Sequence, residues 1–177
     1  IDADTGSDDA VALVMAIRNL PQESIMGITI ASGNVPLEQG ISNALYVNEL
    51  CGTNIDVYAG ESAPISRPYI ELDNIQQATT HALSQDPASS SAQYVHGQDG
   101  LGDLGLKPEN KTYSNITALE FYKKVLSTNS DVEIVALGPL SNLARLIEEE
   151  PKLLSSIKHC YIMGGCSNGV GNITKNA

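Results

Sequence analysis

Hydrophobic positions along the chain follow two alternating spacings. Short runs rich in β-branched residues, typical of buried strands, alternate with stretches whose apolar residues recur every three to four positions, typical of amphipathic helices. The expected strands cover residues 25–31, 55–58, 132–137 and 157–163, and the expected helices cover residues 10–17, 37–51, 117–126 and 140–149. Because this order favours parallel strands covered by helices, it predicts an α/β fold with three layers, a mostly parallel sheet and an open, Rossmann-like topology.

Local signals support several of these boundaries. Gly52 is placed to end the second helix, Thr117 and Glu120 have the spacing of a capping box, and Pro151 is expected to open a short helical turn. Between residues 60 and 115 the periodicity weakens and Pro, Ser, Gln and Gly accumulate. We therefore expect a long insertion or active-site loop there, with room for short helices, and not a second domain.

The composition narrows the classes of function. With 177 residues, 42% of them hydrophobic, the chain can form one domain with a core. Its net charge of -11, single Phe and absent Trp argue against nucleic-acid and anionic-membrane partners. No apolar run is long enough to span a membrane, and three cysteines without zinc-type spacing fit a reducing compartment. We expect a soluble, cytoplasmic protein that binds a neutral or cationic small molecule.

Four of the first nine residues are aspartates: Asp2, Asp4, Asp8 and Asp9, with Gly6 between the two pairs. Two carboxylates about 4 Å apart repel by roughly 4 kcal/mol at an effective dielectric near 20, so a fold that gathers them must neutralise them. Oxygen ligands with no His or Cys nearby favour Ca²⁺ or Mg²⁺, and a flexible loop containing glycine suits the larger ion. The motif therefore predicts a calcium site.

A simpler alternative explains part of the same motif. Asp8 and Asp9 could merely cap the helix that follows and complement its dipole, while Asp2 and Asp4 face solvent. This alternative accounts for two of the four aspartates, so we favour the metal site.

Four polar or glycine-rich turns fall where ligands bind in open parallel sheets, beyond the carboxyl ends of strands. They are residues 2–9, 33–34, 137–139 and 163–165. Asn34 offers a neutral donor and acceptor, and Leu137 can present a bare carbonyl before a Gly-Pro turn. We expect these turns to converge on one polar, metal-binding crevice.

Together these residues resemble the nucleoside hydrolase family, the calcium-dependent enzymes that cleave the N-glycosidic bond of ribonucleosides. The resemblance is carried, in the family's order, by Asp2-Ala-Asp4-Thr-Gly6-Ser-Asp8-Asp9, Gly33-Asn34, His96-Gly97-x-Asp99-Gly100-Leu101, Gly138-Pro139-Leu140-Ser141-Asn142, and Met163-Gly164-Gly165 with Gly171-Asn172. It implies hydrolysis of ribonucleosides to ribose and free base, a small-molecule nucleoside as the partner, and a homodimer or homotetramer.

The resemblance also implies a set of metal ligands. Asp4 would ligate calcium and act as the general base on the attacking water, and Asp9 would hold the metal through both oxygens. The carbonyl of Leu137 would complete part of the calcium shell, and Asp2 would support the metal loop from behind. Since cleavage of a ribosyl C–N bond builds positive charge on the ribose, an acidic pocket suits the reaction.

Substrate contacts follow from the same resemblance. Asp8 would bind a ribose hydroxyl, and Asn34 would line the ribose and water site and take part in catalysis. Met163 would pack against the sugar, Asn172 would hydrogen-bond its hydroxyls, and His96 would sit on the loop that closes over the base.

The chain departs from the family pattern in two places. Thr5 stands where the family usually has Pro, which removes no ligand. The residues that the family supplies beyond Asn172, including a further Asp ligand and often a His acid, are absent. We therefore expect residues 1–177 to be a single α/β domain that is an incomplete amino-terminal part of a longer one.

Two other functions remain as alternatives. A Mg²⁺-dependent phosphohydrolase of the haloacid dehalogenase type also begins with a strand followed by Asp-x-Asp, but Gly6 stands where that class needs Thr or Val, and the Asp8-Asp9 pair has no role in it. A catalytically inactive fragment that binds calcium and nucleoside would keep the motif without turnover.

Overall fold

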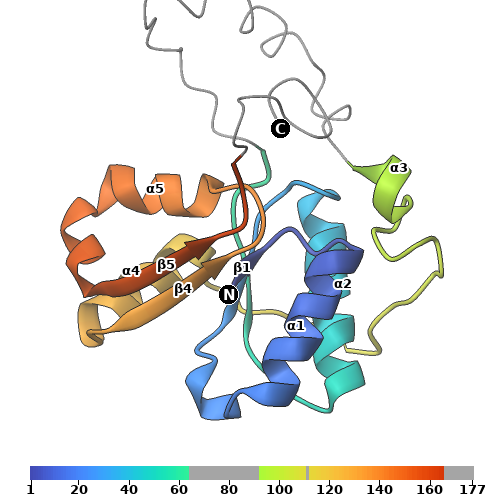
Figure 1. The fold of residues 1–177 in the computed structure, drawn as a ribbon, viewed down its shortest axis with the longest axis horizontal. Helices are drawn as coiled ribbons and strands as arrows, with labels where there is room; N and C mark the ends of the chain where they lie inside the picture. Colours follow the sequence, from blue (N-terminus) through green and yellow to red (C-terminus); the bar gives the residue numbers. More distant parts are fainter. Residues whose placement is uncertain (64–91, 111, 166–177) are drawn as a thin grey trace, which may run out of the picture.

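A single parallel sheet organises the part of the chain that the structure describes, which in this computed structural model is residues 1–63, 92–110 and 112–165 (Figure 1). Its strands are β1 (Asp2–Ala3), β2 (Ile28–Ile30), β3 (Val57–Ala59), β4 (Val132–Ala136) and β5 (Ile157–Ile162). They lie in the order β3-β2-β1-β4-β5, and every neighbouring pair is parallel. The chain thus steps outward from β1 to β3 and later returns to the other side of β1.

Helices cover the two faces of this sheet. α1 (Ser7–Asn19) and α2 (Leu37–Cys51) pack together on one face, whereas α4 (Ala118–Thr128) and α5 (Ser141–Glu149) pack together on the other. The remaining described helices are short: α3 (Gln93–His96) and the 3-10 helices η1 (Gln22–Ser24) and η4 (Pro151–Ser156). The expected three-layer α/β fold is confirmed.

Alternation along the strands decides which side chains meet which helices. Ile28 and Ile30 of β2 pack with Leu13 of α1 in one core, and Thr29 between them points to the opposite face, where its hydroxyl lies 3.0 Å from that of Tyr122. On that second face Tyr58 stacks on Phe121, with ring centroids 4.0 Å apart. The sheet therefore separates two apolar sides, and Thr29 and Tyr122 bring hydroxyl groups into the second one.

Most helix boundaries agree with those expected from the sequence. The second helix covers the predicted residues 37–51 and ends at Gly52, whose φ of 69° is the left-handed conformation that glycine adopts freely. Thr117 and Glu120 form the predicted capping box, and Pro151 opens a 3-10 helix. The strands are shorter than predicted; β2, for example, starts at Ile28 and not at residue 25.

Among the described residues, no helix covers one face of β4 and β5, because α1 and α2 lie over β1, β2 and β3. Val135 and Tyr161 on this face are 36% and 52% exposed, and beside them His159 Nδ1 lies 3.2 Å from Glu133 Oε1.

No helix in the described ranges is long and apolar enough to cross a membrane.

Candidate metal and substrate site

Asp4 and Asp9 meet at the carboxyl end of β1. Asp4 lies just beyond the last residue of that strand, and Asp9 is in the first turn of α1. The side-chain amide of Asn34 donates to both carboxylates, with Nδ2 3.2 Å from Asp4 Oδ1 and 3.1 Å from Asp9 Oδ2. The backbone N–H of Asn34 also donates to Asp4 Oδ2 at 2.7 Å. The structure thus brings these three predicted site residues together, and their role stays a prediction.

Two glycines allow the neighbouring turns to approach Asp4. A Cβ on Gly33 would overlap Asp4 Oδ2, and a Cβ on Gly138 would lie 2.9 Å from Asp4 Cγ. The N–H of Leu137 donates to the backbone oxygen of Asp2 at 2.8 Å. This hydrogen bond holds Leu137, the residue before Gly138, beside β1. Three of the four predicted turns therefore converge on Asp4.

Burial gives this carboxylate pair unusual electrostatics. Asp4 and Asp9 are only 6% and 3% exposed. Burial, and then the negative charge of Asp9, raises the pKa of Asp4 to about 8. Burial is also the largest cause that raises the pKa of Asp9. Two buried oxygen ligands whose charge is poorly neutralised suit a hard divalent cation. The described residues contain no cluster of three or more His, Cys, Asp or Glu side chains able to hold a metal, so the donors present fit part of a coordination shell.

Asp2 lies behind this pair and is fully buried. Its Oδ2 accepts hydrogen bonds from Thr29 Oγ1 at 2.5 Å, Tyr122 OH at 3.0 Å and Asn142 Nδ2 at 2.9 Å. Its Oδ1 has no hydrogen-bond partner among the residues that the structure describes, and burial raises the pKa of the carboxyl despite the three donors. Asp2 thus ties β1 to β2, α4 and α5.

The helix-cap alternative is half right. Asp9 does cap α1, because its Oδ2 accepts the N–H of Gly6 at 3.0 Å. The expectation that Asp2 and Asp4 face solvent under this alternative is wrong, since both are buried. A pure capping role therefore does not explain the motif.

His96, at the end of α3, lies against the start of α1. Its Nδ1 is 2.7 Å from the hydroxyl of Ser7 and 3.9 Å from Asp8 Oδ1. The His96 side chain is buried, whereas Ser7 and Asp8 are exposed. The structure thus brings the two predicted substrate residues Asp8 and His96 together, and it adds Ser7, which sequence reasoning did not single out.

Asn43 of α2 is a second residue that the sequence analysis missed. It is 1% exposed, and its Nδ2 donates to the backbone oxygens of Thr5 at 2.9 Å and Asp99 at 2.8 Å. It therefore joins the acidic loop to the loop after His96. The sequence does hold one indication of this role: Asn43 lies on the same face of the second helix as Gly40 and Val47, which is its apolar face.

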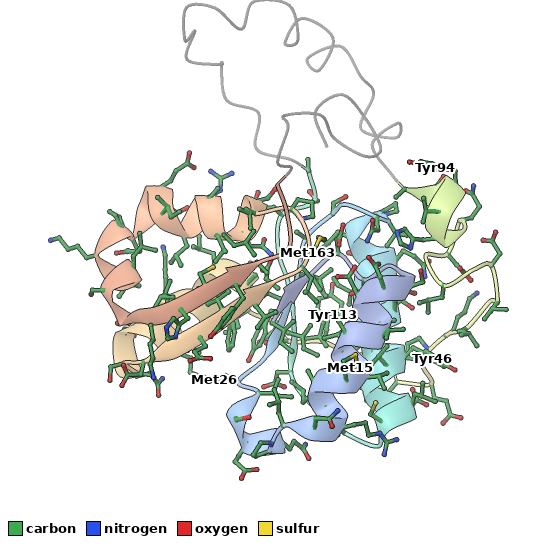
Figure 2. All side chains as sticks on the ribbon, viewed as in Figure 1. Met15, Met26, Tyr46, Tyr94, Tyr113 and Met163 are labelled. Atoms are coloured by element: carbon green, nitrogen blue, oxygen red, sulfur yellow. The ribbon has the colours of Figure 1, made fainter. Side chains whose placement is uncertain are left out.

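Of the two remaining predicted substrate residues, the structure describes Met163. Met163 follows β5, where its N–H donates to Ala136 O at 2.8 Å, and its side chain is 61% exposed (Figure 2). Asn172 lies outside the described residues.

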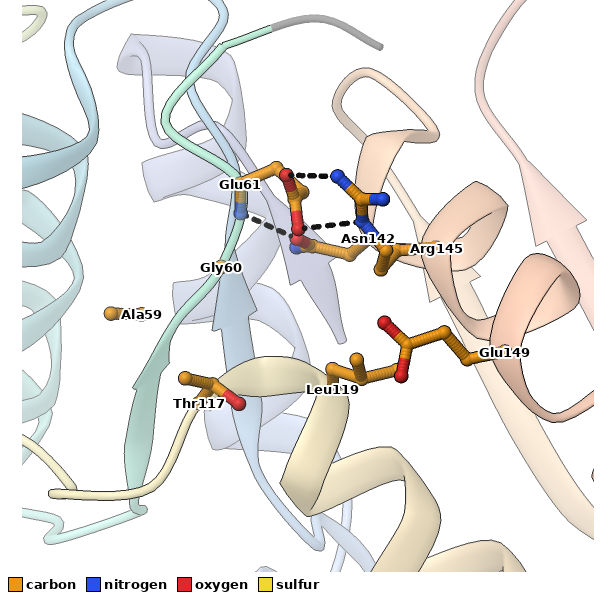
Figure 3. Close-up of a pocket in the computed structure, with 8 residues that line it drawn as sticks. All are labelled: Ala59, Gly60, Glu61, Thr117, Leu119, Asn142, Arg145 and Glu149. Carbon is orange, nitrogen blue, oxygen red and sulfur yellow. Dashed lines mark hydrogen bonds and ion pairs between the residues drawn. The ribbon is translucent and has the colours of Figure 1, made fainter.

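A cavity of about 160 Å³ lies beside the carboxyl end of β3 (Figure 3). Its lining comprises Ala59, Gly60, Glu61, Thr117, Leu119, Asn142, Arg145 and Glu149. Arg145 pairs with Glu61 across it at 3.3 Å. None of the predicted site residues that the structure describes lines this cavity, but Asn142 of its lining donates to Asp2 Oδ2 at 2.9 Å.

Comparison with known proteins gives consistent relatives. The family model of the inosine-uridine preferring nucleoside hydrolases matches residues 1–177. The pyrimidine-specific ribonucleoside hydrolase RihB of Escherichia coli O1:K1 / APEC is 33% identical over all of this chain and 50% of its own length. Uridine nucleosidase 1 of Arabidopsis thaliana is 34% identical over all of this chain and 47% of its own length.

Solved structures show the same likeness. An inosine-guanosine nucleoside hydrolase superposes with a TM-score of 0.75 and 27% identity, over 99% of this chain and 50% of that one. A purine-preferring ribonucleoside hydrolase from Gardnerella vaginalis superposes with a TM-score of 0.74 and 27% identity, over 99% of this chain and 52% of that one. The chain spans about half the length of these relatives. Since the family model covers every residue, the chain belongs to the inosine-uridine preferring nucleoside hydrolase family.

Proposed function

We propose that the natural protein hydrolyses the N-glycosidic bond of ribonucleosides to ribose and free base, with calcium held at Asp4 and Asp9. The observation that carries the proposal is the buried carboxylate pair bridged by Asn34, in which burial and the charge of Asp9 raise the pKa of Asp4 to about 8. Such a pair needs a positive charge, and an oxocarbenium-like transition state also needs a negative environment. A single acidic site therefore suits both the metal ion and the positively charged transition state.

In this proposal the carboxylates of Asp4 and Asp9 and the carbonyl of Leu137 hold the metal, and Asp2 supports the loop from the opposite core. Calcium, when bound, would lower the pKa of the attacking water. Asp4 accepts the proton of that water, and Asn34 orients both carboxylates through its shared amide. Each residue is thus assigned the chemical role that its burial and its hydrogen bonds favour.

Substrate recognition falls to the residues around this pair. Asp8 is exposed beside the buried Asp9, whose N–H it accepts at 3.0 Å, and its carboxylate is proposed to accept a further hydrogen bond from a ribose hydroxyl. His96 lies next to it on the loop proposed to close over the base, and Met163 and Asn172 are proposed to contact the sugar. The match of the nucleoside hydrolase family model to residues 1–177 argues against the haloacid dehalogenase alternative, which also gives Asp8 and Asp9 no role.

The full-length natural protein would be incubated with inosine, uridine and cytidine, with and without a calcium chelator, and free ribose would be measured. We expect chelator-sensitive ribose release. Substitution Asp4→Asn should lower kcat by about 10²- to 10⁴-fold, because it removes the base and one charged ligand. Asp131→Asn is the matched control: Asp131 is exposed, and its φ of 62° suits Asn equally well.

Two results would contradict the proposal. Ribose release that the chelator or Asp4→Asn leaves unchanged would remove the metal site from the reaction. Nucleoside binding without any ribose release would instead support the inactive binding-protein alternative.

A further inference from the structure

Ser7 is one of three positions of the acidic motif, with Ala3 and Thr5, that hold neither an aspartate nor a glycine, and it makes two contacts with one ring nitrogen of His96. Its backbone N–H donates to His96 Nδ1 at 3.3 Å, and its Oγ lies 2.7 Å from that atom. Ser7 is the first residue of α1, where backbone N–H groups have no acceptor within the helix. His96 therefore supplies an acceptor that the helix itself lacks.

These contacts determine which ring nitrogen carries the hydrogen. A backbone N–H can only donate, so Nδ1 of His96 must present its lone pair to Ser7, and the hydrogen of the neutral imidazole is on Nε2. The carboxylate of Asp8, 3.9 Å from Nδ1, would favour the opposite tautomer, with a hydrogen on Nδ1. The backbone N–H identifies Nδ1 as an acceptor but lies 3.3 Å away, so the nearer hydroxyl of Ser7, 2.7 Å from the same lone pair, is the donor that holds this tautomer against the carboxylate.

We propose that Ser7 is a positioning residue that holds His96 in the Nε2–H tautomer and fixes α3 against the start of α1. His96 then offers a hydrogen-bond donor, and not an acceptor, to a nucleoside bound beside Asp8. The last statement rests on the proposed function, whereas the tautomer and the contact with Ser7 do not.

The tautomer can be read directly from the long-range ¹H–¹⁵N correlations of the imidazole rings in the full-length natural protein, with His96→Gln used to assign the signals. We expect the wild-type pattern of Nε2–H. Ser7→Ala should shift His96 toward a mixture of tautomers, and Ser7→Thr, which keeps the hydroxyl, should restore the wild-type pattern. Because Ser7 is exposed, Ser7→Ala is not expected to unfold the protein. Ser127→Ala, at an exposed site on α4, is the control.

A second measurement links the contact to activity. Ser7→Ala should lower kcat/KM for the best nucleoside about five- to tenfold, the effect of one lost neutral hydrogen bond, without changing the calcium Kd, and Ser7→Thr should restore it. A wild-type Nδ1–H pattern, or an unchanged pattern in Ser7→Ala, would overturn the proposal. If no nucleoside is hydrolysed at all, the proposed function fails, while the imidazole spectra still decide the role of Ser7.

Discussion

Asn34 shows how one side chain sets the character of the site at the scale of single residues. Its neutral amide donates to Asp4 and Asp9 together, so the two carboxylates share one partner. Such a shared donor does not offset the cost of burying both charges, which is why burial still raises the pKa of each carboxyl. With its pKa raised to about 8, Asp4 therefore holds a proton at lower pH that a metal ion would displace.

Calcium binding should therefore depend on pH. Because calcium binds deprotonated carboxylates and the pKa of Asp4 is about 8, protons compete with the metal below pH 8. We expect the calcium Kd of the full-length protein to rise about tenfold per pH unit below this value for each proton released, and to level off above it. Titration calorimetry in two buffers of different ionisation enthalpy measures the calcium Kd and the number of protons released. A Kd that is constant between pH 6 and pH 8, without proton release, would contradict this prediction.

At the scale of elements, α4 begins where local chemistry dictates. Thr117 Oγ1 accepts the N–H of Glu120 at 3.2 Å, and the Glu120 carboxylate accepts the N–H of Thr117 at 2.7 Å. The backbone hydrogen bond from Thr117 is the main cause that lowers the pKa of Glu120. This start is readable in the sequence because capping needs only neighbours three residues apart.

Substitution Thr117→Ala should lower the free energy of unfolding by about 1 kcal/mol, because it removes the acceptor for one N–H of the first turn. Ser127→Ala on the same helix should change it much less, since Ser127 bonds only the carbonyl of Lys124 in the exposed last turn. Since the folded state lowers the pKa of Glu120, the contribution of this cap is present above the ordinary pKa of 4.5 and is lost as the pH falls. Urea unfolding measures the free energy of unfolding of both variants. Equal losses in Thr117→Ala and Ser127→Ala would argue against the cap.

At the scale of the whole molecule, Asn142 connects parts of the sheet that lie far apart in the sequence. Its Nδ2 donates to Asp2 Oδ2 at 2.9 Å. Its Oδ1 accepts the N–H of Glu61 at 2.8 Å, a contact that Figure 3 shows. The first contact spans 140 residues. A side chain on Gly60 would occupy the place of the Asn142 amide, so this glycine makes the contact possible.

Substitution Asn142→Ala should destabilise the protein by about 2 kcal/mol or more, because it leaves the buried Asp2 with one donor fewer and the N–H of Glu61 without its acceptor. Asn19→Ala should cost less than about 0.5 kcal/mol, since Asn19 is exposed and bonds only Met15 O in its own helix. Chemical denaturation of the two variants compares them. An Asn142→Ala variant as stable as Asn19→Ala would show that the link between β1 and β3 carries no stability.

The sequence by itself determined the alternation of strands and helices, the parallel three-layer fold, the cap at Thr117, the stop at Gly52 and the pairing of Asp4 with Asp9, because each depends on residues a few positions apart or on strand ends that share one edge. Only the tertiary structure decided that Asp2 faces the second core beside Tyr122, that Ser7 contacts His96, and that Asn43 and Asn142 join separate loops. These contacts cross 38 to 140 residues of chain, and their geometry depends on how the helices pack, which local spacing does not encode.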